Sequence, residues 1–178
     1  MIDSILLHLR LVSFAICTGL AGSAAAQDNL TAATPPLGKV VKFNNWTVLC
    51  PTTTDKSGSK CIAQLALIDS KRKIILVTWR IGYSKDRALL ADVVTPSEVF
   101  IPPGVRLDYG KNQSVTLAYV SCGLQSCLSR IALSDDLIQK LSKASDVTIS
   151  LAGTNRKMLQ LKINATGLGD ALKFIMQP

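Results

Sequence analysis

Short β-type segments separated by turn residues make up most of the chain after residue 44. Each segment is rich in Val, Ile, Leu, Thr or an aromatic residue, and Gly, Pro, Asn, Asp or Ser stand between consecutive segments. Helices do not alternate with these segments, as a parallel sheet would require. The pattern therefore predicts a mainly β fold, an antiparallel β-sandwich-like single domain. The predicted strands cover residues 45–50, 61–68, 73–81, 88–94, 101–109, 114–122, 126–133, 146–153 and 158–165.

One or two short helices are predicted near the C-terminus. Ser134 can cap a helix over residues 134–144, where apolar residues recur at helical spacing. Residues 169–176 form a second, shorter helix candidate, and the strand before it alternates between apolar and polar residues. The residues expected to face the core are Leu137, Ile138, Leu141 and Ala144 in the first helix, Leu159, Leu161 and Ile163 in the strand, and Leu172, Ile175 and Met176 in the second helix.

The N-terminus has the pattern of a secretory signal peptide. Residues 5–20 are mostly apolar with one charge, Arg10, and small residues follow in the sequence GSAAAQ. This arrangement predicts a signal over residues 1–26 with cleavage after Ala26. A retained membrane anchor is the alternative, but the apolar run is short for a span of about 20 residues. A lipoprotein signal fits less well, because Ile16 precedes Cys17 where a small residue is expected.

The segment that follows the predicted signal is polar and contains two consecutive prolines. This composition predicts a flexible leader over residues 27–42. The β domain is then expected to cover residues 43–178. Cleavage removes one basic and one acidic residue, Arg10 and Asp3, so the formal net charge of +8 is unchanged.

Cleavage also removes His8, the only histidine of the sequence. Histidine is the usual general base near neutral pH and the commonest metal ligand. Its loss argues against Ser-His-Asp and Cys-His catalysis and against histidine-containing metal sites. We therefore expect no catalytic residue, no metal and no cofactor. Ser-Lys chemistry is the remaining enzymatic alternative, and its spacing occurs twice, at Ser57/Lys60 and Ser70/Lys73.

Four cysteines remain in the mature chain: Cys50, Cys61, Cys122 and Cys127. An even number in an exported chain favours disulfides, and local pairing of Cys50 with Cys61 and of Cys122 with Cys127 fits the predicted strands best. Redox activity and metal binding are the alternatives, but both normally use Cys-x-x-Cys spacing. In the loop-entropy description the two bridges would stabilise the fold by about 3 and about 2 kcal/mol respectively.

Several motifs follow one another between about Trp46 and Leu172: Trp46 within WTVLC, Cys50, Cys61, Pro103-Gly104-Val105, Cys122, Cys127 and the capped helix. Their order resembles that of the invasion-associated locus B family of exported bacterial proteins. The resemblance implies an alphaproteobacterial envelope or secreted protein with no catalytic residues, and founding members of the family are associated with entry into host cells, notably erythrocytes. One departure is Ser126, where the family pattern leads us to expect Gly.

The positive charge of the chain favours anionic partners or surfaces. Most basic residues are scattered, and one cluster, Lys71-Arg72-Lys73, is expected in a turn where it could contact an anionic partner. Lipopolysaccharide, peptidoglycan, anionic host glycans and membrane lipids are the candidates, and a merely solvated basic surface is the alternative. Nucleic acid is not expected, because aromatic residues are not interleaved with the basic ones.

These features together predict a non-enzymatic protein of the bacterial envelope with no transmembrane segment after cleavage. The expected location is the periplasm or the exterior, and the outer envelope is a further alternative. It would mediate contact with an envelope or host-surface component. The alternatives are a periplasmic chaperone or inhibitor that binds through its sheet edges and a cryptic Ser/Lys hydrolase.

Overall fold

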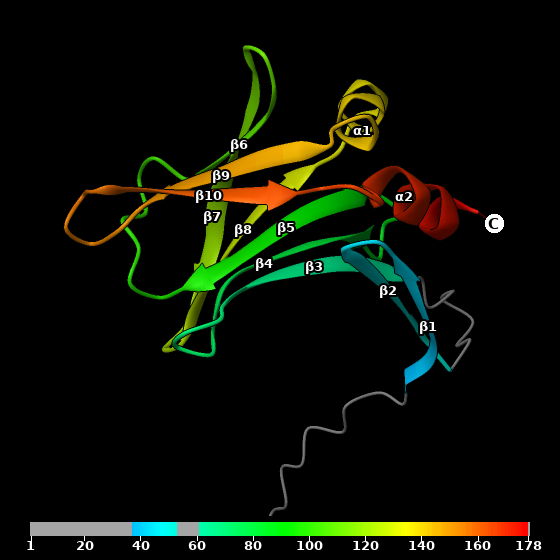
Figure 1. Ribbon diagram of the computed structural model, residues 1–178, viewed down its shortest axis with the longest axis horizontal. Coiled ribbons are helices and arrows are strands. Elements are labelled where there is room, and N and C mark those ends of the chain that lie inside the picture. The colour runs from blue at the N-terminus through cyan, green and yellow to red at the C-terminus, as the bar shows by residue number, and fades with distance from the viewer. Residues whose placement is uncertain (1–36, 53–60, 178) are drawn as a thin grey trace, which may run out of the picture. The chain divides into compact units, whose positions relative to one another are not determined.

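The computed structural model describes residues 37–52 and 61–177, which belong to one compact unit, Thr34–Pro178. The predicted mainly antiparallel β fold with two short helices is confirmed (Figure 1). The elements are β1 (Leu37–Phe43), β2 (Trp46–Pro51), β3 (Ile62–Asp69), β4 (Ile74–Tyr83), β5 (Leu89–Pro96), β6 (Val105–Gly110), β7 (Gln113–Cys122), β8 (Ser126–Ala132), α1 (Asp135–Ser142), β9 (Asp146–Ala152), β10 (Met158–Asn164) and α2 (Leu168–Met176).

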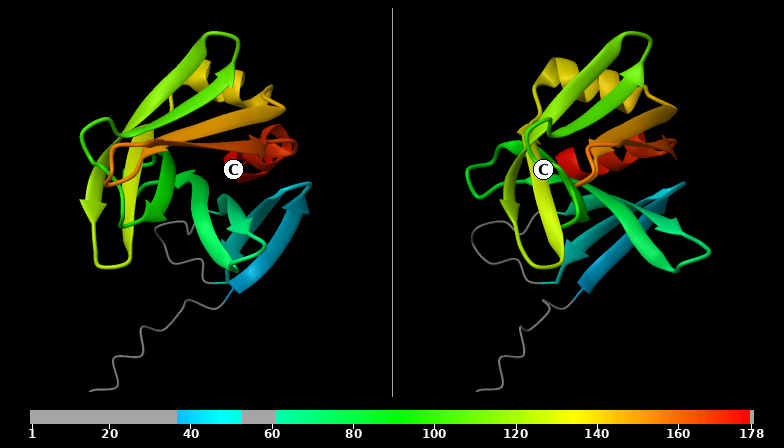
Figure 2. Two further views of the ribbon diagram at one scale, coloured as in Figure 1. Left: turned by 60° about the vertical axis from the view of Figure 1, so that its left-hand side comes forward. Right: turned by 90° about the vertical axis from the view of Figure 1, so that its left-hand side faces the viewer.

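The strands of the described residues form one ten-stranded sheet in the order β1-β2-β3-β4-β5-β8-β7-β6-β9-β10. The sheet folds back on itself at β7. The first half of β7 pairs with β6, and its second half, from Ala118, pairs with β8. Strands β6, β9 and β10 therefore form a layer beside β3, β4 and β5, as the two views of Figure 2 show. This is the way one strand makes the corner between two packed sheets.

The core lies between the two layers and is built around two tryptophans. The rings of Trp46 on β2 and Trp79 on β4 are fully buried and meet edge to face, with centroids 5.1 Å apart. The indole Nε1 of Trp46 donates a hydrogen bond of 3.3 Å to the carbonyl oxygen of Ala165. This bond ties β2 to the segment between β10 and α2. The buried residues around the pair include Val48, Leu65, Val77, Ile81, Val93, Leu107, Leu117, Val147, Ile149 and Ile163.

The two helices close one end of the core. The hydroxyl of Ser134 accepts a hydrogen bond from the backbone N–H of Leu137 at 3.3 Å, which satisfies a free donor at the start of α1. Helix α1 buries Leu137 and Leu141, and α2 buries Leu168, Ala171, Leu172 and Ile175. In Figure 1 the helices lie side by side at the end of the sheet, and they contact each other.

Three details of the sequence-based prediction are wrong. The leader was predicted to reach residue 42, but residues 37–43 form β1, which pairs with β2 through a turn at Asn44-Asn45. The segment 101–104 was included in a strand, but it forms a turn because Pro102 and Pro103 have no backbone N–H for a ladder. Two side chains that were expected in the core are exposed. They are Leu159, near the start of β10, and Met176, in the last turn of α2.

Gly104 ends that turn in a conformation that requires glycine. Its φ of +69° lies in the left-handed region, and a Cβ atom there would lie 2.5 Å from the carbonyl oxygen of Leu117 on β7. This close approach explains why glycine stands between Pro103 and Val105, where β6 begins beside the bend of β7.

We expect Gly104→Ala to lower the free energy of unfolding by about 1–3 kcal/mol, because it adds both backbone strain and a clash with β7. Urea denaturation measures the change. Gly123→Ala is the matched control, because Gly123 is exposed and the nearest heavy atom to its added Cβ is 3.9 Å away. Equal stability of the two variants would contradict the role assigned to Gly104.

Candidate functional site

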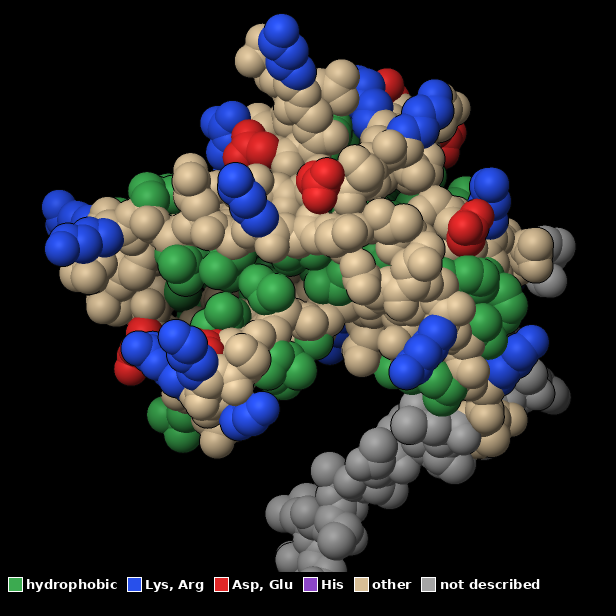
Figure 3. All heavy atoms as spheres, in the orientation of Figure 1, with side chains coloured by type: hydrophobic (Ala, Val, Ile, Leu, Met, Phe, Trp, Pro, Cys, Tyr) green, Lys and Arg blue, Asp and Glu red, His purple; other side chains and the backbone are tan. Residues whose placement is uncertain are grey.

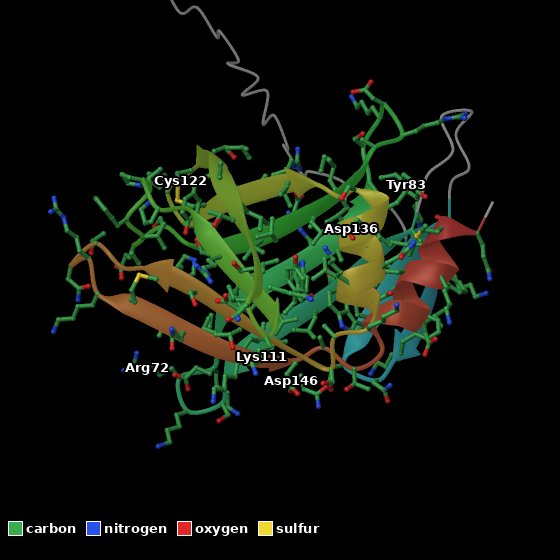
Figure 4. The ribbon with its side chains drawn as sticks, turned by 90° about the horizontal axis from the view of Figure 1, so that it is seen from above. Arg72, Tyr83, Lys111, Cys122, Asp136 and Asp146 are labelled. Atoms are coloured by element: carbon green, nitrogen blue, oxygen red, sulfur yellow. A yellow bond between two sulfur atoms is a disulfide. The ribbon has the colours of Figure 1, made fainter. Side chains whose placement is uncertain are left out.

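Both disulfides that the spacing predicts are present in the structure. Cys50 at the end of β2 is joined to Cys61 just before β3, and Cys122 on β7 is joined to its cross-strand partner Cys127 on β8. Cys127 is buried in the core, whereas Cys122, labelled in Figure 4, is exposed. All four cysteines in the described part of the chain are thus in disulfide bridges. Residues 37–52 and 61–177 contain no cluster of side chains suited to binding a metal ion.

The basic cluster Lys71-Arg72-Lys73 lies on the turn between β3 and β4, as predicted, and all three side chains are exposed. Asp69 organises this turn. One of its carboxylate oxygens accepts hydrogen bonds from the backbone N–H groups of Lys71, at 2.9 Å, and Arg72, at 3.1 Å. The backbone N–H of Lys73 donates to the carbonyl oxygen of Asp69 at 2.8 Å. The three side chains are therefore exposed to a partner, while the backbone that carries them is fixed.

The same backbone hydrogen bonds act on the Asp69 carboxyl group. Those from Arg72 and Lys71 lower its pKa below the usual value for aspartate, because they stabilise the charged form. The Arg72 guanidinium lies 4.0 Å from the second carboxylate oxygen and acts in the same direction. Asp69 therefore stays ionised and holds the turn at every pH above its lowered pKa.

Exposed isoleucines surround this basic turn. Ile68 on β3 is 54% exposed, and Ile74 and Ile75 on β4 are 45% and 56% exposed. Figure 3 shows hydrophobic side chains beside the group of basic side chains at the lower left, and in Figure 4 Arg72 extends from the turn away from the sheet. We call residues 68–75 the basic tip. It combines positive charge with apolar surface on a protruding hairpin.

The structure describes one of the two Ser-Lys pairs that the sequence offers. Ser70 and Lys73 lie on the basic tip, both exposed, and no hydrogen bond joins their side chains. Ser57 and Lys60 lie outside the described residues.

A second charged group, on the outer face of the sheet, was not found from the sequence. Arg80, Asp92 and Arg130 are directly opposite one another on the adjacent strands β4, β5 and β8. The guanidinium of Arg130 binds both carboxylate oxygens of Asp92, with Nε–Oδ1 at 2.7 Å and Nη2–Oδ2 at 2.9 Å. This pairing with Asp92 raises the pKa of Arg130. Arg80 approaches the same carboxylate less closely, with Nη2–Oδ2 at 3.8 Å.

The sequence did carry a signal for this row. Each of the three residues is a single charge inside an apolar strand, in the stretches TWRIG, LADVV and LSRIAL. Such charges mark outward-facing positions. The pairing order β4-β5-β8 brings them together, and it is not visible from local pattern because β6 and β7 intervene in the chain.

Two hairpin disulfides in a mainly β domain are typical of proteins that fold outside the reducing cytoplasm. Within that class the chain belongs to the family described as Invasion associated locus B (IalB) protein, which matches residues 46–176, so the resemblance drawn from the motifs is confirmed. No curated protein matches the chain.

The fold is similar to that in the crystal structure of invasion associated protein b from Bartonella henselae. The TM-score is 0.66 over 78% of this chain and 96% of that one, with 12% sequence identity. At this level of identity the similarity concerns the fold alone. No helix of the described residues has the length and apolar character needed to cross a membrane.

Removing each bridge should lower the free energy of unfolding. We expect a loss of about 3 kcal/mol for Cys50→Ala/Cys61→Ala and about 2 kcal/mol for Cys122→Ala/Cys127→Ala, since the closed loops differ in length. Urea denaturation of both double variants, compared with the oxidised protein, measures these losses. Unchanged stability in either variant would show that its bridge constrains nothing.

The Asp69 interaction predicts a pH-dependent change confined to the basic tip. The folded pKa of Asp69 is lowered, so the stabilisation is present above the unfolded pKa and is lost as the pH falls through the folded value. In an NMR titration the amide signals of Lys71 and Arg72 should shift together, with a midpoint below that of an ordinary aspartate. Asp69→Asn should abolish this shared transition, and its persistence in that variant would assign it to another group.

Proposed function

We propose that this chain is an exported, non-enzymatic protein of the bacterial envelope, periplasmic or secreted, that binds an anionic component of the envelope or of a host surface through the basic tip. One observation carries the proposal: Lys71, Arg72 and Lys73 are exposed on a fixed turn whose flanking residues are exposed isoleucines. The signal pattern, the two disulfides and the family support the exported location.

An anionic lipid surface matches this chemistry best among the candidates. Each basic residue near an anionic membrane surface contributes about 1 kcal/mol of attraction. Apolar side chains next to such residues can enter the boundary between headgroups and acyl chains, which a soluble glycan does not offer. Ile68, Ile74 and Ile75 lie where that second contribution is available. The basic tip therefore supplies both components of peripheral membrane binding.

Binding through the sheet edges is less well supported. The edges of the described sheet are β1 and β10. Exposed lysines lie on both of them, Lys39 and Lys42 on β1 and Lys162 on β10. Charged side chains on an edge strand, lysine above all, discourage the addition of another strand.

The experiment is sedimentation of the oxidised mature protein with phospholipid vesicles at about 0.15 M salt. We expect binding to vesicles that contain phosphatidylglycerol and little binding to pure phosphatidylcholine vesicles. Lys71→Ser/Arg72→Ser/Lys73→Ser should weaken the binding on the order of 100-fold, because three charges that each contribute about 1 kcal/mol are removed. Ile74→Ser/Ile75→Ser should also weaken the vesicle binding, although this double variant keeps the net charge of the protein.

The matched control removes the same charge elsewhere. Lys111, Lys143 and Lys162 are exposed residues on separate parts of the chain, and replacing all three by Ser should leave most of the binding intact. An equal loss in both triple variants would show that net charge alone, rather than the basic tip, drives binding. Absence of binding to the phosphatidylglycerol vesicles, together with binding to heparin, would replace the lipid surface by an anionic glycan.

A further inference from the structure

We propose that the hollow over Arg80, on the outer face of the sheet, binds a small organic carboxylate. The hollow has a volume of about 520 Å³, within the range of small-molecule sites. Its lining includes Arg80, Arg130, Ile62, Leu90, Gly82 and Tyr83. In Figure 4 Tyr83 and Arg72 lie at opposite sides of the view, in keeping with their places at the two ends of β4, so the hollow is separate from the basic tip.

Arg130 and Arg80 differ in how many of their N–H donors are bonded to Asp92. Arg130 satisfies both oxygens of Asp92 through two short, parallel bonds. Arg80 is left with one longer contact of 3.8 Å to the same carboxylate. Its Nε atom is buried and has no hydrogen-bond partner among the described residues. A guanidinium has five N–H donors, so Arg80 retains donors for an acceptor that enters the hollow.

The charge balance favours an anion. The row contains two guanidinium groups and one carboxylate, which leaves one positive charge in excess on this part of the sheet. The other charged residues of the lining, Lys85 and Asp86, cancel each other. The side chain of Asp92 is 15% exposed and that of Arg80 is 39% exposed, so water screens this excess less than it would on an open surface.

The shape of the lining narrows the class of anion. A carboxylate carries a single charge, which matches the excess, and its two oxygens fit the planar fork of an arginine. Ile62 and Leu90 supply apolar walls, and Gly82 has no side chain between them. A Cβ atom on Gly82 would lie 3.2 Å from Cγ1 of Ile62. Ile62 therefore packs closely over Gly82, and Ile62 and Leu90 offer an apolar surface to the body of a ligand whose carboxylate reaches Arg80.

The test is a titration of the oxidised mature protein with benzoate, followed by NMR signals of the backbone amides and of the arginine Nε–H groups. We expect saturable shifts at the Arg80 Nε–H and the Gly82 amide. Arg80→Gln should weaken binding at least tenfold, and Arg80→Lys, which keeps the charge but not the fork, should weaken it severalfold. Arg106→Gln is the matched control, because it breaks the exposed ion pair of Arg106 with Asp108 on β6 and should leave the affinity unchanged.

Two further probes keep the proposal falsifiable if Arg80→Gln fails to fold. Benzyl alcohol, which lacks the charge, should cause no saturable shift at Gly82. Inorganic phosphate should bind more weakly than benzoate, since it makes no use of the apolar walls. Shifts by benzoate that spread over the basic surface without saturating, or equal binding of benzoate and benzyl alcohol, would overturn the proposal. Loss of vesicle binding through the basic tip would leave this result untouched, because the two sites do not share a residue.

Discussion

The shared pairing of β7 is the constraint on which the rest of the structure depends. Strand β7 divides its length between two neighbours: Gln113–Leu117 pair with β6, and Ala118–Cys122 pair with β8. The register shift between Tyr119 and Ser121 is the kind of irregularity that lets a strand bend. The bend turns one sheet into two facing layers, and only then can Trp46 and Trp79 be enclosed. Gly104 and the Cys122–Cys127 bridge lie near the two ends of the region that must stay bent.

The inward-facing side chains of the strands are buried in the core, so only the outward-facing side chains are available to bind a partner or ligand. On β4 the inward positions are Val77, Trp79 and Ile81, and the outward position between the last two is Arg80. The same alternation places Asp92 and Arg130 outside. Beyond the enclosed part of β3 and β4, Ile68, Ile74 and Ile75 have no facing layer and stay in solvent. The positions of the basic tip and of the arginine hollow thus follow from which parts of β3 and β4 the layer of β6, β9 and β10 covers.

Local pattern in the sequence was sufficient for the fold class, the two helices and the disulfides. Ser134 identified the start of α1, and the spacing of the cysteines identified two hairpins. The strand β1 was missed because its residues do not alternate strictly, although Asn44-Asn45 before Trp46 is a turn signal, and Asn44 has the positive φ that such a turn uses. The basic tip was located from three adjacent residues. The row of Arg80, Asp92 and Arg130 was not, since its members are brought together by strand pairing across the intervening β6 and β7.

Strand β4 has the basic tip at one end and the arginine hollow at the other. From Lys73 of the basic tip to Arg80 of the hollow the chain advances seven extended residues, about 23 Å, which is nearly three times the screening length of about 8 Å at physiological salt. The charges at the two ends therefore act independently, and a ligand at one does not alter the field at the other. A molecule lying with its tip on a surface would hold the hollow away from that surface, facing the medium. In geometric terms β4 is a spacer between the two proposed points of contact.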